Sequence, residues 1–269
     1  MDVLIESPDY EIDMKAGLET LQGISEATRC VAETLITGKV PQRKSYRSSV
    51  RTNLKKTFKG SYGQIFSLEI TNEDQRQKFR KIGNGTFVEL FSFFMKESLY
   101  LESAKLSKKA EAIIEGLGDN AEQLVKQLRV SAMADAHRIS KAFNQSVTIR
   151  HRKSIQEKPH IAKFDRKTVM ALEAREKEQT VEITAGITRL NIHTGNGRLL
   201  LKGHEETVAF GFGIGYKEVA LDAKKKFSEN LDRNNGINND AWEYLSITAT
   251  PIRQRDGKIV KYIVRAYRD

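Results

Sequence analysis

Apolar residues near the start of the chain recur every three or four positions, which is the period of an amphipathic helix. The recurrence begins after Asp13, a residue type that caps helix N-termini, and stops before Gly38, a residue type that follows helix C-termini. Pro8 separates this segment from a short apolar run over residues 2–6. We therefore expect a short strand followed by a helix from Asp13 to about Thr37.

A strict alternation replaces the helical period further along the chain. Tyr46, Val50 and Leu54 share one parity, and basic residues hold the positions of the other parity. Those basic residues are Arg47, Arg51 and Lys55. Successive side chains of a strand point to opposite faces, so one face is expected to pack and the other to be basic. A turn at 58–61 and a second alternating run at 65–70 complete a predicted β-hairpin.

The middle of the chain is predicted to be helical. Residues 87–101 are apolar nearly all round, which indicates a buried helix. Asp119 can cap a further helix to about Asn144. Residues 146–167 are basic, contain Pro159 and lack helical period, so we interpret them as a connector. The expected domains are 1–148, helix-rich with a basic hairpin; 149–180, a connector with a short helix; and 181–269, a small β-barrel.

The stretch VAFGFGIGY, residues 208–216, raises the question of a phosphate-binding loop. Its even-numbered positions are large and apolar, and its odd-numbered positions are Ala or Gly. This period of two indicates a strand, whereas dinucleotide and Walker loops require other glycine spacings. The small face implies that a backbone or ligand approaches closely, or that the strand bends sharply, as a small barrel requires.

The last part of the chain reads as three strands, a helix and two strands. HTGNG separates the first two strands, and RQRDG, with its Asp-Gly hairpin signal, separates the last two. This order is that of an OB-like barrel, a fold that binds oligonucleotides or oligosaccharides on its second and third strands. The fold class is therefore predicted as α+β, with a helical N-terminal domain carrying a hairpin and a five-stranded OB-like barrel carrying one helix.

The charge of the chain changes the functional picture. The net charge is +10, and residues 35–68 hold no acid, so polyanions are expected partners. We expect a non-enzymatic protein that binds nucleic acid, DNA or RNA, through the hairpin and the barrel. The residues expected to contact it are Arg43, Lys44, Arg47, Arg51, Lys55, Lys56, Lys59, Arg150, Arg152, Lys153, Arg198, Lys202, Arg253, Arg255 and Lys258.

A second interpretation stays open. Glu19, Glu26 and Glu33 of the first helix could pair with the basic hairpin, within one chain or between copies. The protein would then be an oligomeric scaffold or adaptor subunit that binds through its acidic helix and basic hairpin. An acidic protein is an expected partner in that case.

No catalytic constellation, metal site or cofactor site is predicted. PDYEIDMK, residues 8–15, resembles a nuclease metal pattern, but Asp9 and Asp13 are too close in sequence to lie on two strands. None of the histidines has metal-ligand spacing. Cys30 is the one cysteine, which excludes an intramolecular disulfide and a cysteine-based zinc site.

The most apolar stretch argues against a membrane protein. Residues 88–101 are interrupted by charges and are shorter than the ~20 residues that a membrane span needs. The N-terminus is acidic where a signal peptide would be basic. We expect a cytoplasmic protein without a membrane partner.

Several segments carry a resemblance that covers most of the chain. They are LETLQG at 18–23, KGSYGQIFSLEI at 59–70, GITRLN at 186–191 and GNGRLLLKGHEETVAFGF at 195–212. In these segments the chain resembles uncharacterised two-domain proteins of bacteria and phages, which have a helical first domain and a small β-barrel. The resemblance implies a prokaryotic or phage setting with a role near genome defence, and it carries no activity.

Overall fold

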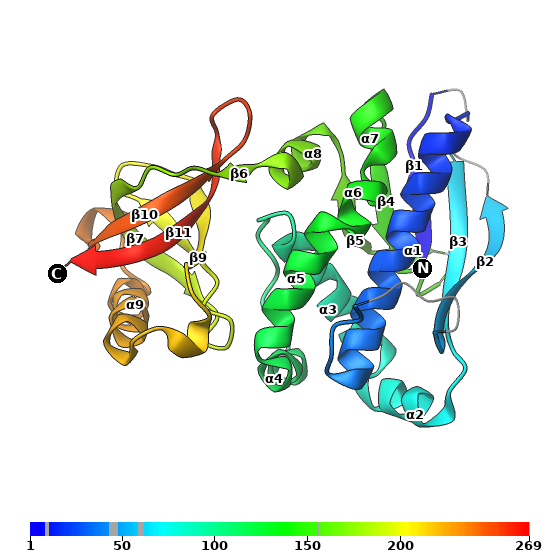
Figure 1. Cartoon of the computed structure of the whole chain (residues 1–269), viewed down its shortest axis with the longest axis horizontal. Helices are drawn as coiled ribbons and strands as arrows, with labels where there is room; N and C mark the ends of the chain where they lie inside the picture. The colour runs from blue at the N-terminus through cyan, green and yellow to red at the C-terminus, as the bar shows by residue number, and fades with distance from the viewer. Residues whose placement is uncertain (9–10, 43–47, 59–61, 155, 269) are drawn as a thin grey trace. The chain divides into compact units, whose positions relative to one another are not determined.

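The computed structural model describes residues 1–8, 11–42, 48–58, 62–154 and 156–268. It divides into two compact units, Met1–Leu172 and Glu173–Asp269, each with its own hydrophobic core. Figure 1 shows a sheet covered by helices in the first unit and a small barrel in the second.

The first unit contains a five-stranded antiparallel sheet in the order β2-β3-β1-β4-β5. Its strands are β1 (Asp2–Ile5), β2 (Val50–Phe58), β3 (Tyr62–Ile70), β4 (Val147–Arg150) and β5 (His160–Phe164). The expected hairpin is β2 and β3, but two segments of the expected connector at 146–167 form the strands β4 and β5. Of these two strands, β4 shows no alternation because it is buried on both faces beside β1.

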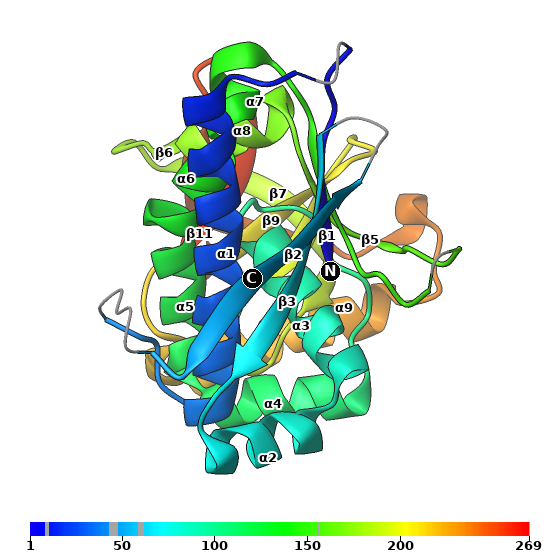
Figure 2. The ribbon, with the colours of Figure 1, turned by 90° about the vertical axis from the view of Figure 1, so that its right-hand side faces the viewer.

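Helices cover one face of this sheet (Figure 2). The helices of this unit are α1 (Met14–Thr37), α2 (Glu73–Ile82), α3 (Asn84–Glu97), α4 (Lys108–Leu117), α5 (Asp119–Val130), α6 (Ala132–Ala136), α7 (Arg138–Phe143) and α8 (Arg166–Glu173). The caps of α1 are the expected ones: Asp13 Oδ1 accepts from the Ala16 amide at 2.8 Å, and Gly38 has a left-handed φ of 72°. The single helix expected from Asp119 to Asn144 is divided into α5, α6 and α7.

The break between α5 and α6 has a local cause. Ser131 takes φ −124° and ψ −89°, and its hydroxyl donates to the carbonyl of Gln127. The next helix, α6, lies very close to α1 at Gly23, where glycine leaves room for it. A Cβ added at Gly23 would be 2.2 Å from the Ala136 amide nitrogen. The chain therefore changes direction at Ser131, and α6 packs closely against α1.

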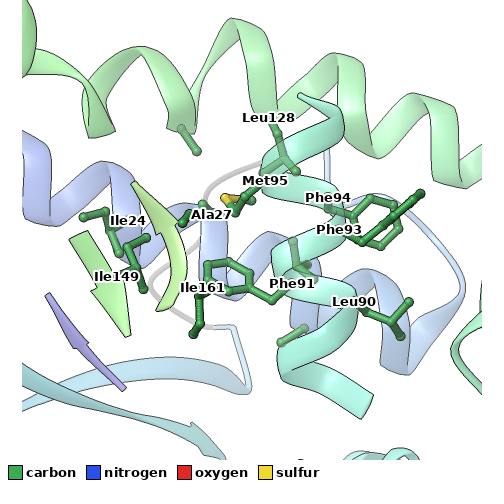
Figure 3. Close-up of a cluster of buried hydrophobic side chains, with 14 of the residues drawn as sticks. Ile24, Ala27, Leu90, Phe91, Phe93, Phe94, Met95, Leu128, Ile149 and Ile161 are labelled. Atoms are coloured by element: carbon green, nitrogen blue, oxygen red, sulfur yellow. The ribbon is translucent and has the colours of Figure 1, made fainter. Parts of the chain in front are cut away.

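The core of the first unit is built around α3. Phe91, Phe94 and Met95 are fully buried, as the apolar character of this segment predicted. Figure 3 places Phe91 beside Ile161 of the sheet and Met95 beside Leu128 of α5. The helix therefore links the sheet to the second layer of helices.

The second unit is a closed barrel with the predicted OB-like topology. Its main strands are β7 (Val181–Leu190), β8 (Gly197–Leu201), β9 (Thr207–Phe212), β10 (Leu245–Arg253) and β11 (Ile259–Arg268), with β6 (Arg175–Glu176) added to β10. The order β7-β8-β9-β11-β10 returns to β7, and the β9–β11 pair is parallel. Between β9 and β10, the helix α9 (Leu221–Asn234) inserts Phe227 into the core against Phe210, 5.5 Å between ring centroids.

Short 3-10 turns flank α9 at Tyr216–Glu218 and Asn239–Ala241. None of the helices in the described part of the chain combines the length and the apolar character that a membrane crossing needs.

Candidate nucleic-acid interface

The glycine face of β9 lies under two basic side chains. Phe210 points into the barrel and is fully buried, so Gly211 and the neighbouring odd positions face outward. A Cβ at Gly211 would lie 3.0 Å from Lys261 Nζ, and a Cβ at Gly213 would lie 2.3 Å from Arg265 Nη1. The small residues thus make room for cations of the neighbouring strand β11. The strand predicted for VAFGFGIGY is confirmed over VAFGF only. The strand ends at Phe212, and residues 213–216 lead into the 3-10 turn Tyr216–Glu218.

A row of basic residues crosses the outer face of the barrel. Arg189 of β7 pairs with Arg198 of β8, which pairs with Ala209 of β9, which pairs with Lys261 of β11. Residues opposite one another in a sheet share a face. Their neighbours Leu199, Phe210 and Tyr262 are buried inside, so the row lies outside.

Two members of the row are held by hydrogen bonds. Arg198 donates from Nε to Thr207 Oγ1 at 2.8 Å and from Nη2 to the Thr207 carbonyl at 2.7 Å. Lys261 Nζ donates to Asn196 Oδ1 at 2.8 Å. These contacts fix the two cations on the face formed by β8, β9 and β11.

The other predicted basic residues of the barrel lie in its turns. Arg253, Arg255 and Lys258 belong to the β10–β11 turn or the strand end before it, and Arg253 donates to the Gly257 carbonyl. Arg255 and Lys258 are 82% and 64% exposed and form long ion pairs with Glu173 and Glu206. Such exposed ion pairs contribute little to stability, so the two cations can leave their carboxylate partners for another anion.

Lys202 follows β8, and its Nζ lies 5.6 Å from the centre of the Tyr244 ring. The Lys258–Glu206 pair joins the β8–β9 turn to the β10–β11 turn. The structure therefore brings Lys202 and the β10–β11 residues to neighbouring turns, close to the row that contains Arg198.

Three basic residues of this face were missed by the sequence: Arg189, Lys261 and Arg265. Lys261 and Arg265 have a parity opposite to the core residues Tyr262 and Val264 of β11, which is a detectable signal. Arg189 shares the parity of buried Ile187 and changes face only through a bulge between the two residues, which the sequence does not indicate. The alignment of the three basic residues with Arg198 depends on the register between strands distant in sequence, which no local pattern specifies.

The hairpin residues form a less regular surface than predicted. Arg51, Lys55 and Lys56 are exposed and form no ion pair with the described residues. A bulge between Leu54 and Lys56 interrupts the alternation at Lys55. Val50 is buried as expected, but Leu54 is 66% exposed and is not a core residue. The predicted contacts Arg43, Lys44, Arg47 and Lys59 lie outside the described residues.

Two of the arginines that were expected to contact nucleic acid form ion pairs within the first unit. Arg150 Nε lies 2.8 Å from Asp2 Oδ1, and Arg152 Nε lies 3.5 Å from Asp2 Oδ2. Asp2 is fully buried, and both guanidinium groups lie over the Phe58 ring. The two arginines therefore neutralise the buried carboxylate of Asp2, and neither of them is a freely available cation.

The remaining predicted residue of this segment, Lys153, forms an exposed ion pair with Glu157 at 2.6 Å.

The acids of α1 face partners other than the described basic residues of β2. Glu19 pairs with Arg138 at 3.3 Å, Glu26 accepts from Gln22, and Glu33 accepts from the Ser48 hydroxyl. α1 packs against the face of β2 opposite to Arg51. The pairing of acidic helix and basic strand within one chain therefore does not involve Arg51, Lys55 or Lys56.

Burial shifts the pKa values of His137 and Cys30, two residue types that often act in catalysis, away from neutral pH. Burial lowers the pKa of His137 to about 4, and its ring contacts the Met133 carbonyl and the Thr168 hydroxyl. Burial, with Glu33 and Glu26 nearby, raises the pKa of the Cys30 thiol to about 12. Among the described residues no cluster of three or more His, Cys, Asp or Glu could hold a metal ion. Asp13 caps α1, and Asp9 lies outside the described residues.

Comparisons with family models, curated proteins and solved structures found no match to this chain. Function is therefore inferred from the residues and contacts described above.

Proposed function

We propose that the protein binds nucleic acid on the outer face of its C-terminal barrel. The observation that carries the proposal is the row of Arg189, Arg198 and Lys261 across β7, β8 and β11. Neighbouring strands are about 4.8 Å apart, so the row extends over roughly 14 Å. A stacked strand rises about 3.4 Å per nucleotide, so the row can contact several phosphates.

The charge of this face favours nucleic acid over the other ligand class of OB-like barrels. Such barrels bind oligonucleotides or oligosaccharides on the same strands. Fixed cations stabilise phosphate through charge-assisted hydrogen bonds, whereas a neutral sugar gains little from them. Arg255 and Lys258 at the neighbouring turn extend the positive surface.

The barrel is preferred to the hairpin because its cations are aligned. The bulge at Lys55 breaks the line of charge on β2, and Arg150 and Arg152 are engaged by Asp2. The resemblance to two-domain proteins of bacteria and phages adds a genome-defence setting to the proposal.

The test is fluorescence anisotropy with labelled single-stranded and double-stranded oligonucleotides over a salt series. The variant Arg189→Gln/Lys261→Gln removes two cations and keeps Arg198, whose bonds to Thr207 join β8 to β9. We expect at least about tenfold weaker binding, and a log–log salt slope that is smaller by roughly 1.4 to 1.8.

The matched control is Lys55→Gln/Lys56→Gln, which removes the same charge from the first unit. Its binding is expected to change by less than about twofold, because exposed charges outside the contact act weakly. Circular dichroism checks that both variants fold. The proposal fails if the wild type does not bind at low salt, or if only the control variant loses binding.

A further inference from the structure

β2 lies at one end of the strand order of its sheet, so one side of its backbone faces away from β3. The bond from the Thr71 amide to the Ser49 carbonyl, 2.8 Å, defines which residues of β2 are hydrogen-bonded to β3. In an antiparallel pair these residues alternate with ones whose N–H and C=O point away. Val50, Thr52 and Leu54 are therefore the residues whose backbone faces the free edge.

Only the first of these three is already satisfied. The Val50 amide donates to the Ser48 hydroxyl, and its carbonyl accepts from Arg29 Nε, both at 3.1 Å. The outward N–H and C=O groups of Thr52 and Leu54 have no partner among the described residues. An unpaired edge of this kind is a template for another strand.

An apolar groove lies beside this edge, on the side of α1. It has a volume of about 270 Å³ and lies between Leu18 and Leu21 of α1, Leu54 of β2 and Phe66 of β3. Leu18 is 53% exposed and Leu54 is 66% exposed, although both are apolar. Apolar side chains of an added strand would cover these leucines.

The opposite side of the same edge is basic. Arg51 and Lys56 point away from the groove, because they pair with Glu69 and Ile65, which have the parity opposite to buried Phe66. Lys55, at the bulge, is exposed and adds a third cation. No acid occurs in β2, and the acid opposite Arg51 on β3 is Glu69, whose carboxylate accepts from Asn53 Nδ2 at 2.8 Å. The three cations of β2 therefore leave this side of the edge positive.

We propose that the edge of β2 binds an extended segment of a partner protein in which acidic and apolar side chains alternate. The segment would be a sixth strand of the sheet, bonded to the backbone of Thr52 and Leu54. Its apolar side chains would lie in the groove beside Leu18, and its acidic side chains would face Arg51 and Lys56. This mode, β-strand addition, obtains affinity from the backbone and specificity from alternate side chains.

The charge pattern distinguishes this occupant from two others. A second copy pairing through its own β2 would place Arg51, Lys55 and Lys56 against the same cations, which is unfavourable. Nucleic acid would satisfy the cations but would leave the groove and the outward backbone groups uncovered. The peptide site is separate from the barrel face, so either one can fail alone.

The experiment uses the full chain and a fluorescein-labelled peptide of about eight residues in which Glu and Val alternate, a usual strand length. A block peptide has the same composition with all Glu first. A third peptide carries N-methyl groups on alternate amides, and a fourth carries them on the other set. We expect the alternating peptide to bind, and the block peptide to bind at least about tenfold more weakly. We also expect one N-methylated peptide to lose binding and the other to keep it.

Two protein variants locate the site. Leu54→Asp and Lys55→Glu/Lys56→Glu are each expected to weaken binding of the alternating peptide by at least about tenfold. The matched control, Lys105→Glu/Lys108→Glu near α4, is expected to leave it within about twofold. Circular dichroism confirms that each variant folds.

Three results would overturn the proposal. They are no binding of the alternating peptide below about 1 mM, equal binding of the alternating and block peptides, and displacement of the bound peptide by an oligonucleotide whose own binding requires Lys55 and Lys56. The last result would assign the edge to nucleic acid. Failure of the barrel variant to lose oligonucleotide binding would leave the peptide results unchanged.

Discussion

The first unit leaves its sheet open at β2, whereas the second unit pairs β10 with both β7 and β11 and closes its sheet. Closure satisfies the backbone of every main strand, so a barrel can offer a ligand only the side chains of its outer face and its turns. An open sheet also offers N–H and C=O groups. The two units are therefore suited to different partners, a polyanion on the row of Arg189, Arg198 and Lys261, and a strand on β2.

The difference extends to buried charge. In the first unit Asp2 lies in the sheet with Arg150 and Arg152 around it. The described core of the barrel is apolar, with Phe210 and Phe227 at its centre. The first unit should thus respond more strongly to the loss of a single charge.

The largest expected effect is the loss of unfolding free energy caused by a core substitution, and it shows whether the two units fold separately. Phe91→Ala in the first core and Phe227→Ala in the barrel should each cost about 3–5 kcal/mol, because both rings are fully buried. Two native probes separate the units: Trp242, the single tryptophan, packs over Gly186 of the barrel, and Cys30 lies in α1.

Urea titrations followed by Trp242 fluorescence and by alkylation of Cys30 measure the two transitions. Phe91→Ala should shift the Cys30 transition alone, and Phe227→Ala the Trp242 transition alone. If each substitution moved both transitions equally, the two units would be one cooperative structure and the comparison would fail.

The next effect concerns Asp2. Asp2→Asn should destabilise the first unit by about 3 kcal/mol, because two arginines would lose the buried carboxylate that they share. The matched control is Glu157→Gln, which removes an exposed pair with Lys153 and should cost less than about 1 kcal/mol. Urea midpoints of the Cys30 transition give both values, and similar values would mean that the Asp2 cluster contributes no more than a surface pair.

The smallest effect is the pH dependence that His137 gives to the stability of the first unit. The pKa of His137 falls from 6.5 to about 4 on folding, so the unfolded chain binds a proton that the folded chain does not. Stability is full above pH 6.5 and is lost as the pH falls toward 4. This one group should cost the first unit about 2 kcal/mol between pH 7 and pH 5.

The measurement compares wild type with His137→Gln at the two pH values, with Trp242 fluorescence as the reference for the barrel. His137→Gln should lower stability at pH 7 and flatten the pH dependence of the Cys30 transition. An unchanged pH dependence in the variant would show that other groups cause the loss.

Local patterns in the sequence determined the elements whose partners lie nearby. The cap at Asp13 and the left-handed Gly38 define α1, because capping depends on a few neighbouring residues. The alternation around Val50 identified the β2–β3 hairpin, and the order of strands and helix identified the barrel. The strand character of VAFGF followed from its period of two in the same way.

Only the tertiary structure decided which distant residues meet. β4 was recognisable only through its pairing with β1, across which Asp2 contacts Arg150. The row of Arg189, Arg198 and Lys261 depends on three strand registers, and the open edge at Thr52 depends on the absence of a described neighbour beside β2. Periodicity specifies the face on which a side chain lies, but register and strand order are set by long-range packing, and those positions create both proposed sites.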